Sequence, residues 1–338
     1  AHPLVPTGHE VAWDQFKLPA YRPVDPVDLS SLPALRLDDQ PDAARIEGEH
    51  FTLVFDKTSG QIQSFVYRGT ELVRTGLVPH FWRAPNDNDL GNGMPIRSGI
   101  WREAGQNQRI DQVTVTPVDD RTVRITVAST LPAGDSKYET RYTIYGSGDV
   151  IVESAFEPGA DSLPELPRFG MTMTLPGAFT HLAWFGRGPH ESYWDRKTGA
   201  AVGLYEGAVW DQYHDYSRPQ ENGNKTDVRW LALSNEAGTG LLAVGLPLLS
   251  ASAHQFLNED LAHMPGAQRH GIDVKPRDLV TLNLDHKQMG VGGDNSWGAQ
   301  THPEYTLPAR SYSYCFRLRP FSVEDPPPVV LSKMVFGF

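Results

Sequence analysis

Three polar stretches that contain Gly or Pro are the places in this sequence where residue types and spacing favour chemistry. They are FWRAPNDNDLGNG at 81–93, WFGRGPHESYWDRKTGA at 184–200 and MGVGGDNSWG at 289–298. Each combines turn-forming residues, Asp or Asn, and an aromatic side chain. Carboxamides and carboxylates bind hydroxyl groups, and an indole face can cover the apolar C–H side of a pyranose. The mixture is typical of sugar recognition, with turn capping and corner formation as the structural alternatives.

Other common kinds of site have no local support. The sequence contains no phosphate loop, no His-Glu-x-x-His, no nucleophile elbow and no cysteine cluster. The formal net charge of −11 disfavours a nucleic-acid or anionic-membrane surface. No stretch approaches the roughly 18 apolar residues of a membrane helix. The single cysteine, Cys315, lies in an alternating run and is expected to be a small buried hydrophobe. A soluble globular protein is predicted.

Period-two alternation of apolar residues predicts that the elements around these stretches are antiparallel strands. Hairpins are expected around the turns within 113–127, 138–156, 51–69 and 230–245. Helical periodicity is nearly absent, with one short candidate at 96–104. The sequence therefore predicts an all-β domain.

The pattern also suggests domain boundaries. Residues 1–22 hold one strand-like run, HEVAWDQFKL, which has nothing nearby to pair with and is expected to be the tail strand of a preceding β-domain. Residues 23–44 are rich in Pro and Asp and are expected to be an extended linker. The main domain is placed at 45–320. The tail at 321–338 ends in LSKMVFGF, which needs an apolar surface to lie on and could wrap onto a neighbouring domain or subunit.

Four motifs together resemble one known family. RAPNDNDLG, GRGPHESYWDR, ENGN at 221–224 followed by Arg229, and MGVGGDNSW occur in the order found in the C-terminal domain of the glycoside hydrolase family 2 bacterial β-galactosidases. The likeness covers about 45–320. TGHEVAWDQFKL also resembles the end of the immunoglobulin-like domain that precedes this one in the family, which predicts that the chain is cut from something longer.

The resemblance implies an antiparallel β-supersandwich similar to galactose mutarotase. The family's retaining catalysis uses two Glu residues about 5 Å apart, both on a central (β/α)₈ barrel. None of the barrel motifs occurs here, so no catalytic residue is expected in this chain. It is expected to be a non-catalytic part of an enzyme that hydrolyses terminal β-D-galactosides such as lactose.

The resemblance also assigns the expected substrate-binding residues. Trp297 closes the family's GGDxSW motif and is expected to stack on substrate at the mouth of the active site. Asp294 and Ser296 are expected to brace it, with Gly290, Gly292 and Gly293 shaping the turn. In the first motif, Asn88, Asp89 and Gly91 are expected near the same site, with Gly91 and Gly93 permitting a hinged loop. The alternative for Asn88 and Asp89 is that they only cap this loop.

Other motif residues are expected to be structural. Arg83 is expected to form a buried ion pair with a carboxylate of another domain or of its own motif. Glu191, Asp195 and Arg196 are spaced for a fixed turn network. Asn295 stands where the best-known family pattern has a second Asp, and this departure could alter preference for the group beyond the galactose.

By resemblance, the expected partners are a β-galactoside and the barrel and immunoglobulin-like domains of the same enzyme, with a homo-oligomer left open. No nucleic acid or membrane is expected to bind. No metal or other cofactor is expected in this segment, because the Mg and Na ions of the family belong to the absent domains. The expected compartment is the cytoplasm, with the periplasm as the alternative.

Two other functions remain open at this stage. An aldose 1-epimerase would need an acid and a base, for which Glu191 or Glu221 could pair with His190 or His214. A stand-alone carbohydrate-binding module, or a separately encoded small subunit that complements a catalytic one, would also fit the three polar stretches.

Overall fold

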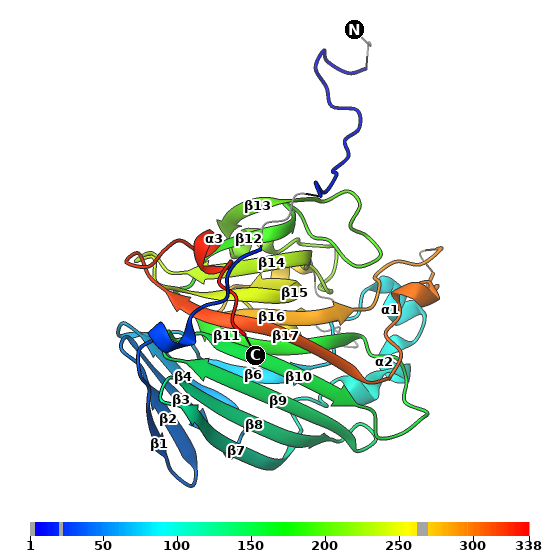
Figure 1. Cartoon of the computed structure of the whole chain (residues 1–338). Helices are drawn as coiled ribbons and strands as arrows, with labels where there is room; N and C mark the ends of the chain where they lie inside the picture. Colours follow the sequence, from blue (N-terminus) through cyan, green and yellow to red (C-terminus); the bar gives the residue numbers. More distant parts are fainter. Residues whose placement is uncertain (1–3, 20–22, 262–269, 296, 338) are drawn as a thin grey trace.

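The chain folds into antiparallel sheets that curl around a common core (Figure 1). The computed structural model describes residues 4–19, 23–261, 270–295 and 297–337. Within these residues all named strand pairs are antiparallel. The prediction of an all-β, antiparallel domain is confirmed.

A five-stranded sheet forms the beginning of the domain and is drawn in blue in Figure 1. Its strands follow the chain order, so each is a hairpin with the next. They are β1 (Arg36–Asp39), β2 (Ala43–Glu47), β3 (Phe51–Asp56), β4 (Gln61–Tyr67) and β5 (Thr70–Glu71).

A twelve-stranded sheet makes up the rest, and its longest path runs β13-β12-β14-β15-β17-β10-β9-β8-β7. A branch leaves β15 through β16 and β11 to β6. The strands are β6 (Thr75–His80), β7 (Arg109–Asp119), β8 (Thr122–Leu131), β9 (Ser136–Tyr145), β10 (Val150–Glu157), β11 (Arg168–Pro176), β12 (His181–Gly188), β13 (Ala201–Ala208), β14 (Lys225–Ser234), β15 (Gly240–His254), β16 (Leu279–Gln288) and β17 (Tyr312–Phe321).

Strand β15 makes this branch because its two halves pair with different strands. Residues 240–246 pair with β17, and residues 250–254 pair with β16. Between them the register of β15 against β14 also shifts. The sheet therefore divides at β15, and its two branches can face each other across a core.

The core is built from the inward positions of both sheets. Strand β3 alternates buried and half-buried positions without a break, as the period-two pattern predicts. One buried cluster joins side chains of the small sheet to those of nearly every strand of the large one, including Phe55, Ile125, Tyr142, Leu182 and Leu282. The predicted hairpins at β3–β4, β7–β8, β9–β10 and β14–β15 are confirmed.

The helices are short and lie mostly between strands. The predicted helix at 96–104 is instead two shorter pieces, which end and begin on either side of Ser98, and the second begins at Gly99, a poor helix former. The α-helices are α1 (Asp87–Gly91), α2 (Met94–Arg97) and α3 (Pro328–Leu331). The 3₁₀ helices are Leu29–Ser31, Gly99–Trp101, Trp210–Gln212, Asn258–Leu261, Gly271–Asp273 and Pro303–Tyr305. In the described part of the chain, no helix has the length and apolar character needed to cross a membrane.

The N-terminal region differs in part from the expected layout. Residues 9–18, expected as a strand of a preceding domain, form no strand here, and their apolar side chains are exposed. Their link to the domain is Gln15, whose carboxamide bonds to both the N–H and the C=O of Val202 on β13 at 2.8 and 2.7 Å. Strand β1 begins at Arg36, so the sheet starts inside the segment expected as a linker.

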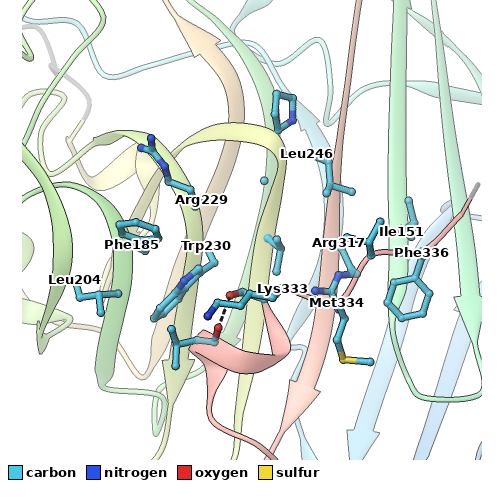
Figure 2. Close-up of a pocket in the computed structure, with 16 residues that line it drawn as sticks. Ile151, Phe185, Leu204, Arg229, Trp230, Leu246, Arg317, Lys333, Met334 and Phe336 are labelled. Atoms are coloured by element: carbon cyan, nitrogen blue, oxygen red, sulfur yellow. Dashed lines mark hydrogen bonds between the residues drawn. The ribbon is translucent and has the colours of Figure 1, made fainter. Parts of the chain in front are cut away.

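The C-terminal tail lies on its own domain. Val335 forms a bridge with Pro26, and the ring of Phe336 packs 4.7 Å from that of Tyr145. Val329 and residues 332–336 border an apolar groove over the outer face of β12–β15 (Figure 2), which Phe185, Leu204 and Trp230 also line. The expected apolar support for LSKMVFGF is therefore supplied within this chain.

Cys315 lies on β17 and is half-buried. Burial raises the pKa of its thiol to about 12. The thiol is therefore neutral at physiological pH and packs as a small hydrophobe, as predicted.

We expect Phe336→Ala to lower the free energy of unfolding by about 3 kcal/mol, because it removes a buried ring from the tail. The guanidinium of Arg317 lies 5.3 Å from the centre of that ring and would lose this contact too. Urea unfolding of the variant and the wild type measures the change. Val323→Ala, at a side chain that is 78% exposed, is the matched control. Equal midpoints for Phe336→Ala and wild type would contradict a packed tail.

Candidate functional site

The four motifs meet at one end of the large sheet because each adjoins a strand end there. The first follows β6, the second includes the end of β12 and continues beyond it, the third precedes β14 and the fourth follows β16. Between them lies an open polar cleft of about 500 Å³. Its lining residues are Asn86, Asp87, Asn88, Tyr193, Arg196, Tyr216, Gln220, Glu221, Val291, Gly292, Gly293, Asp294 and Asn295.

A buried ion pair between Arg83 and Asp89 fixes the first motif. The guanidinium donates to the two carboxylate oxygens at 2.9 and 3.1 Å, and both side chains are almost fully buried. Arg83 also donates to the main-chain carbonyls of Met289 and Gly290. The expected buried pair is confirmed, with the partner in the same motif, and it ties that motif to the glycine-rich loop.

Asp89 was expected to contact substrate, and the structure places it below the surface. Its side chain accepts from the Asn86 amide at 3.1 Å, and the Asn86 side chain accepts from the Asp89 amide at 2.8 Å. This reciprocal capping box begins helix α1. Asn86 also donates to the carbonyl of Val291 at 3.0 Å. The contacts of Asp89 therefore position the loop.

The expected hinge at 91–93 is a helix end. Gly91 is the last residue of α1, and a Cβ there would lie 2.7 Å from the Cα of Gly298. Close contact between two backbones explains glycine at this place better than hinge motion does. Gly93 does take a left-handed conformation, with φ of 74°. Asn88, beside them, donates to the main-chain carbonyl of Asn295 at 3.2 Å.

Asp195 holds the same loop from the opposite side. Its carboxylate accepts from the amides of Val291 at 3.1 Å and Gly292 at 2.8 Å. Its partners therefore lie in the fourth motif and not in its own turn. Glu191 and Arg196 do form the expected pair within the turn.

Trp297 projects from this loop and is 87% exposed. The carboxamide of Asn295 accepts from the amides of Trp297 at 2.9 Å and Ala299 at 3.3 Å. The brace expected from Asp294 thus comes from its neighbour, whereas Asp294 bonds to His302 at 2.8 Å. That bond raises the pKa of the histidine. Ser296 lies outside the described residues.

Glu191 connects the second and third motifs by hydrogen bonds. Its carboxylate accepts from Tyr216 and Arg196 and from the amide of Gly223, the last at 2.8 Å. Gly223 has a φ of 76°, which favours glycine at this turn. The acid is thereby fully engaged in holding the ENGN segment.

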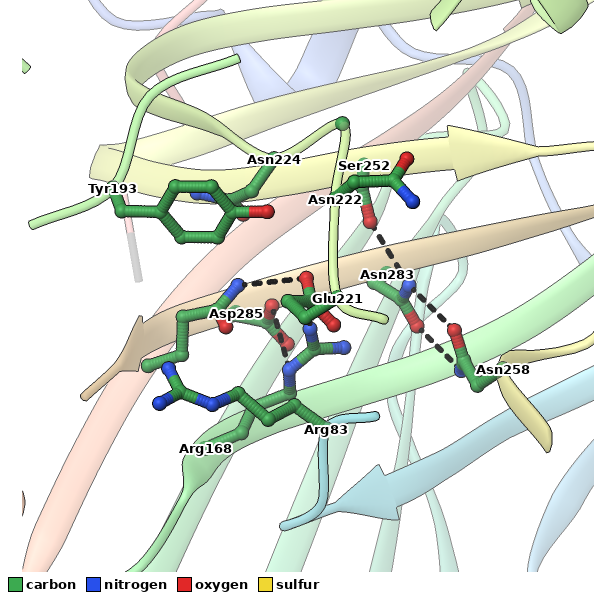
Figure 3. A network of polar contacts seen from close by, with 12 residues as sticks. Arg83, Arg168, Tyr193, Glu221, Asn222, Asn224, Ser252, Asn258, Asn283 and Asp285 are labelled. Carbon is green, nitrogen blue, oxygen red and sulfur yellow. Dashed lines mark hydrogen bonds and ion pairs between the residues drawn. The ribbon is translucent and has the colours of Figure 1, made fainter. Parts of the chain in front are cut away.

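Beneath the cleft Glu221 joins a buried charged group, of which sequence analysis missed Arg168 and Asp285 (Figure 3). Arg168 at the start of β11 is 2.9 Å from Glu221, and its Nε is 3.5 Å from Asp285 on β16. Burial raises the pKa of Asp285 to about 7. The detectable signal was charged residues at inward positions of otherwise apolar strands, at Arg168 and Asp285.

The geometry does not assemble the acid–base pair that an epimerase would need. Glu221 lines the cleft, but neither His190 nor His214 does. The buried histidine of this region, His254, stacks on Phe256, and burial lowers its pKa to about 3. Among the described residues no group of three or more His, Cys, Asp or Glu side chains is placed to hold a metal ion.

Known proteins identify the family of this chain. Residues 47–318 match the family described as "Beta galactosidase small chain". The chain belongs to the β-galactosidase small-chain family. A β-galactosidase from Priestia megaterium is 44% identical over 314 residues, which cover 93% of this chain and 30% of the relative. One from Halalkalibacterium halodurans is 31% identical over 312 residues, which cover 89% of this chain and 30% of the relative. This chain thus spans about 30% of the length of these relatives.

The fold also resembles that of a galactose 1-epimerase from Lactobacillus acidophilus. The TM-score is 0.51 at 10% identity, and the match covers 86% of this chain and 99% of the epimerase. The expected likeness to mutarotases is confirmed at the level of fold.

In this small-chain domain, Asp195→Asn should loosen the glycine-rich loop. The change removes the negative charge that strengthens two bonds to the loop amides, so exchange of the Val291 and Gly292 amides should rise about tenfold. Amide hydrogen exchange checks this. Asp211→Asn, at an exposed carboxylate elsewhere, is the control. Unchanged protection of both amides would show that the loop is held without Asp195.

Asp285→Asn should change how stability depends on pH. Because the folded pKa lies above the unfolded value, the wild type loses stability as pH rises from about 4 to about 7. The variant should lack this loss and exceed the wild type at pH 8 by on the order of 2–4 kcal/mol. Urea unfolding at pH 5 and pH 8 measures it, with the exposed Asp161→Asn as control. Parallel pH profiles would exclude a protonated Asp285.

Proposed function

We propose that the chain is the non-catalytic C-terminal portion of a retaining β-galactosidase of glycoside hydrolase family 2. It completes the mouth of the active site and supplies Trp297 as a stacking surface for terminal β-D-galactosides such as lactose. The observation that carries the proposal is an indole that is 87% exposed on a loop fixed from several sides. Family membership and relatives named β-galactosidase support the substrate class.

An exposed Trp on a fixed loop suits stacking for a physical reason. A large apolar side chain in water gains free energy when a sugar face covers it, by roughly 25 cal/mol per Å² of apolar surface buried. The loop is already ordered by Arg83, Asp195 and Asn295, so little further ordering is required when substrate arrives. Trp297 would thereby orient the sugar before the reaction.

The acids of this site are suited to support rather than to bond cleavage. Asp89, Asp195, Glu191 and Glu221 each accept hydrogen bonds from buried or main-chain donors. A nucleophile or acid/base must face the sugar and change its protonation state during the cycle. We therefore assign the catalytic carboxylates, and the Mg and Na ions of the family, to the part of the enzyme outside this chain.

Trp297→Ala should lower kcat/KM for a chromogenic β-galactoside about fivefold to tenfold when the chain is combined with a barrel-containing part of the enzyme. The expected loss follows from a stacking contact of about 1 kcal/mol. Leu204→Ala, an exposed apolar side chain on β13, is the matched control. Hydrolysis by this chain alone would contradict the absence of catalytic carboxylates, and full activity of the Trp297 variant would make the loop purely structural.

A further inference from the structure

The polar cleft and Trp297 belong to one continuous surface. Residues 292–295 of the glycine-rich loop form one wall of the cleft, and Trp297 projects from the same loop two residues after Asn295. Two residues span at most about 7 Å, so the indole stands next to the cleft. The cleft volume of about 500 Å³ is in the range of small-molecule sites. A ligand that covers the indole can therefore extend into the cleft.

The charged side chains that line the cleft already have partners within the domain. Each forms an ion pair or, for Asp294, a hydrogen bond to a histidine. The four contacts are Asp87–Arg218, Arg196–Glu191, Glu221–Arg168 and Asp294–His302. An ionic ligand would have to compete with these partners, whereas a neutral ligand would not. The cleft is thus suited to an uncharged molecule that forms hydrogen bonds.

Three amide side chains of the cleft use one end within the domain and keep the other end available. Asn88 donates to the main-chain carbonyl of Asn295 at 3.2 Å, and Gln220 donates to that of Arg218 at 3.4 Å. No described residue donates to the side-chain oxygen of either. Asn295 accepts through its own side-chain oxygen, and its NH₂ group has no acceptor among the described residues. Acceptors and a donor together suit hydroxyl groups, because a hydroxyl can both donate and accept.

Glu221 supplies a charged acceptor at the floor of the cleft (Figure 3). Its side chain is only 7% exposed, and its Oε1 accepts from Arg168 at 2.9 Å and from Gln288 at 3.2 Å. These two bonds fix the carboxylate through one oxygen. Within the described residues nothing donates to the other oxygen, Oε2. A hydroxyl that reaches Oε2 would form a charge-assisted hydrogen bond, about twice as strong as a neutral one.

We propose that the cleft is a subsite for a further sugar unit of the substrate, so that the preferred substrates are galacto-oligosaccharides longer than lactose. This inference rests on the proposed function, because Trp297 stacks on the unit that precedes the one in the cleft. The indole supplies an apolar contact for one sugar, and Glu221, Gln220 and Asn295 bind hydroxyls of the next. A neutral sugar does this without breaking any of the ion pairs.

The test is hydrolysis of lactose and of the trisaccharide β-galactosyl-lactose by this chain combined with a barrel-containing part of the enzyme. In the wild type, kcat/KM for the trisaccharide should exceed that for lactose about tenfold. Gln220→Ala should lower this ratio about fivefold, the loss of one neutral hydrogen bond. Glu221→Gln should lower it about tenfold, because an NH₂ group replaces the charged acceptor. Gln112→Ala, at an exposed glutamine on β7, is the matched control and should leave the ratio unchanged.

The outcomes separate this inference from the proposed function. Trp297→Ala should lower kcat/KM for both substrates, whereas the two cleft variants change the ratio. An effect of the cleft variants on the ratio without any effect of Trp297→Ala would contradict the stacking role and support the subsite. A wild-type ratio near one, or a ratio that neither cleft variant changes, would overturn the subsite and indicate that the catalytic part of the enzyme fills the cleft.

Calorimetry with the trisaccharide and this chain by itself gives a second readout, which does not need the catalytic part. Binding that is weakened by Gln220→Ala supports the subsite even if Glu221→Gln disturbs the fold, because Gln220 has no bond to Arg168. Equal binding by the wild type and both cleft variants, or no binding by the wild type, would count against it.

Discussion

The buried pair of Arg83 and Asp89 is the interaction on which the site depends. One planar guanidinium satisfies both oxygens of the acid and two carbonyls of the glycine-rich loop. An isolated charge at this depth would be costly, and the pair offsets that cost because each nitrogen of the guanidinium donates to an acceptor. The helix that carries Asp89 and the loop that carries Trp297 are consequently held in one arrangement.

The order of strands in the large sheet brings segments that are far apart in sequence to this site. Strand β15 bends between two partners, and β16 then ends at Gln288 beside the start of β11 at Arg168. Four strand ends therefore meet at one edge of the domain. The acids at this edge accept hydrogen bonds from donors within the domain. Among the residues described at the site, the one large exposed aromatic side chain is Trp297.

The alternation of apolar and polar residues predicted the strands well, because successive side chains of a strand lie on the buried and the exposed face of a sheet in turn. The hairpins and the neutral Cys315 needed little more than alternation. A buried pair at Arg83 was expected, but its partner was left open between another domain and its own motif, and Asp89 was expected at the substrate. Helix α1 was missed because a five-residue helix leaves no periodicity, and its capping box lies inside a run that resembles a turn. The long-range contacts of Asp195 and Asp285 depend on strand order, which no local window contains.

The contacts that hold the Trp297 loop share one property. Arg83 donates to carbonyls, Asp195 accepts from amides, and Asn86 and Asn88 donate to carbonyls, so each anchors main-chain atoms of the loop. A main-chain anchor does not depend on which side chain is attached to the anchored residue. Exposed positions such as Asp294 can therefore be substituted, by evolution or by design, so that the ligand preference of the loop changes while its backbone conformation is kept.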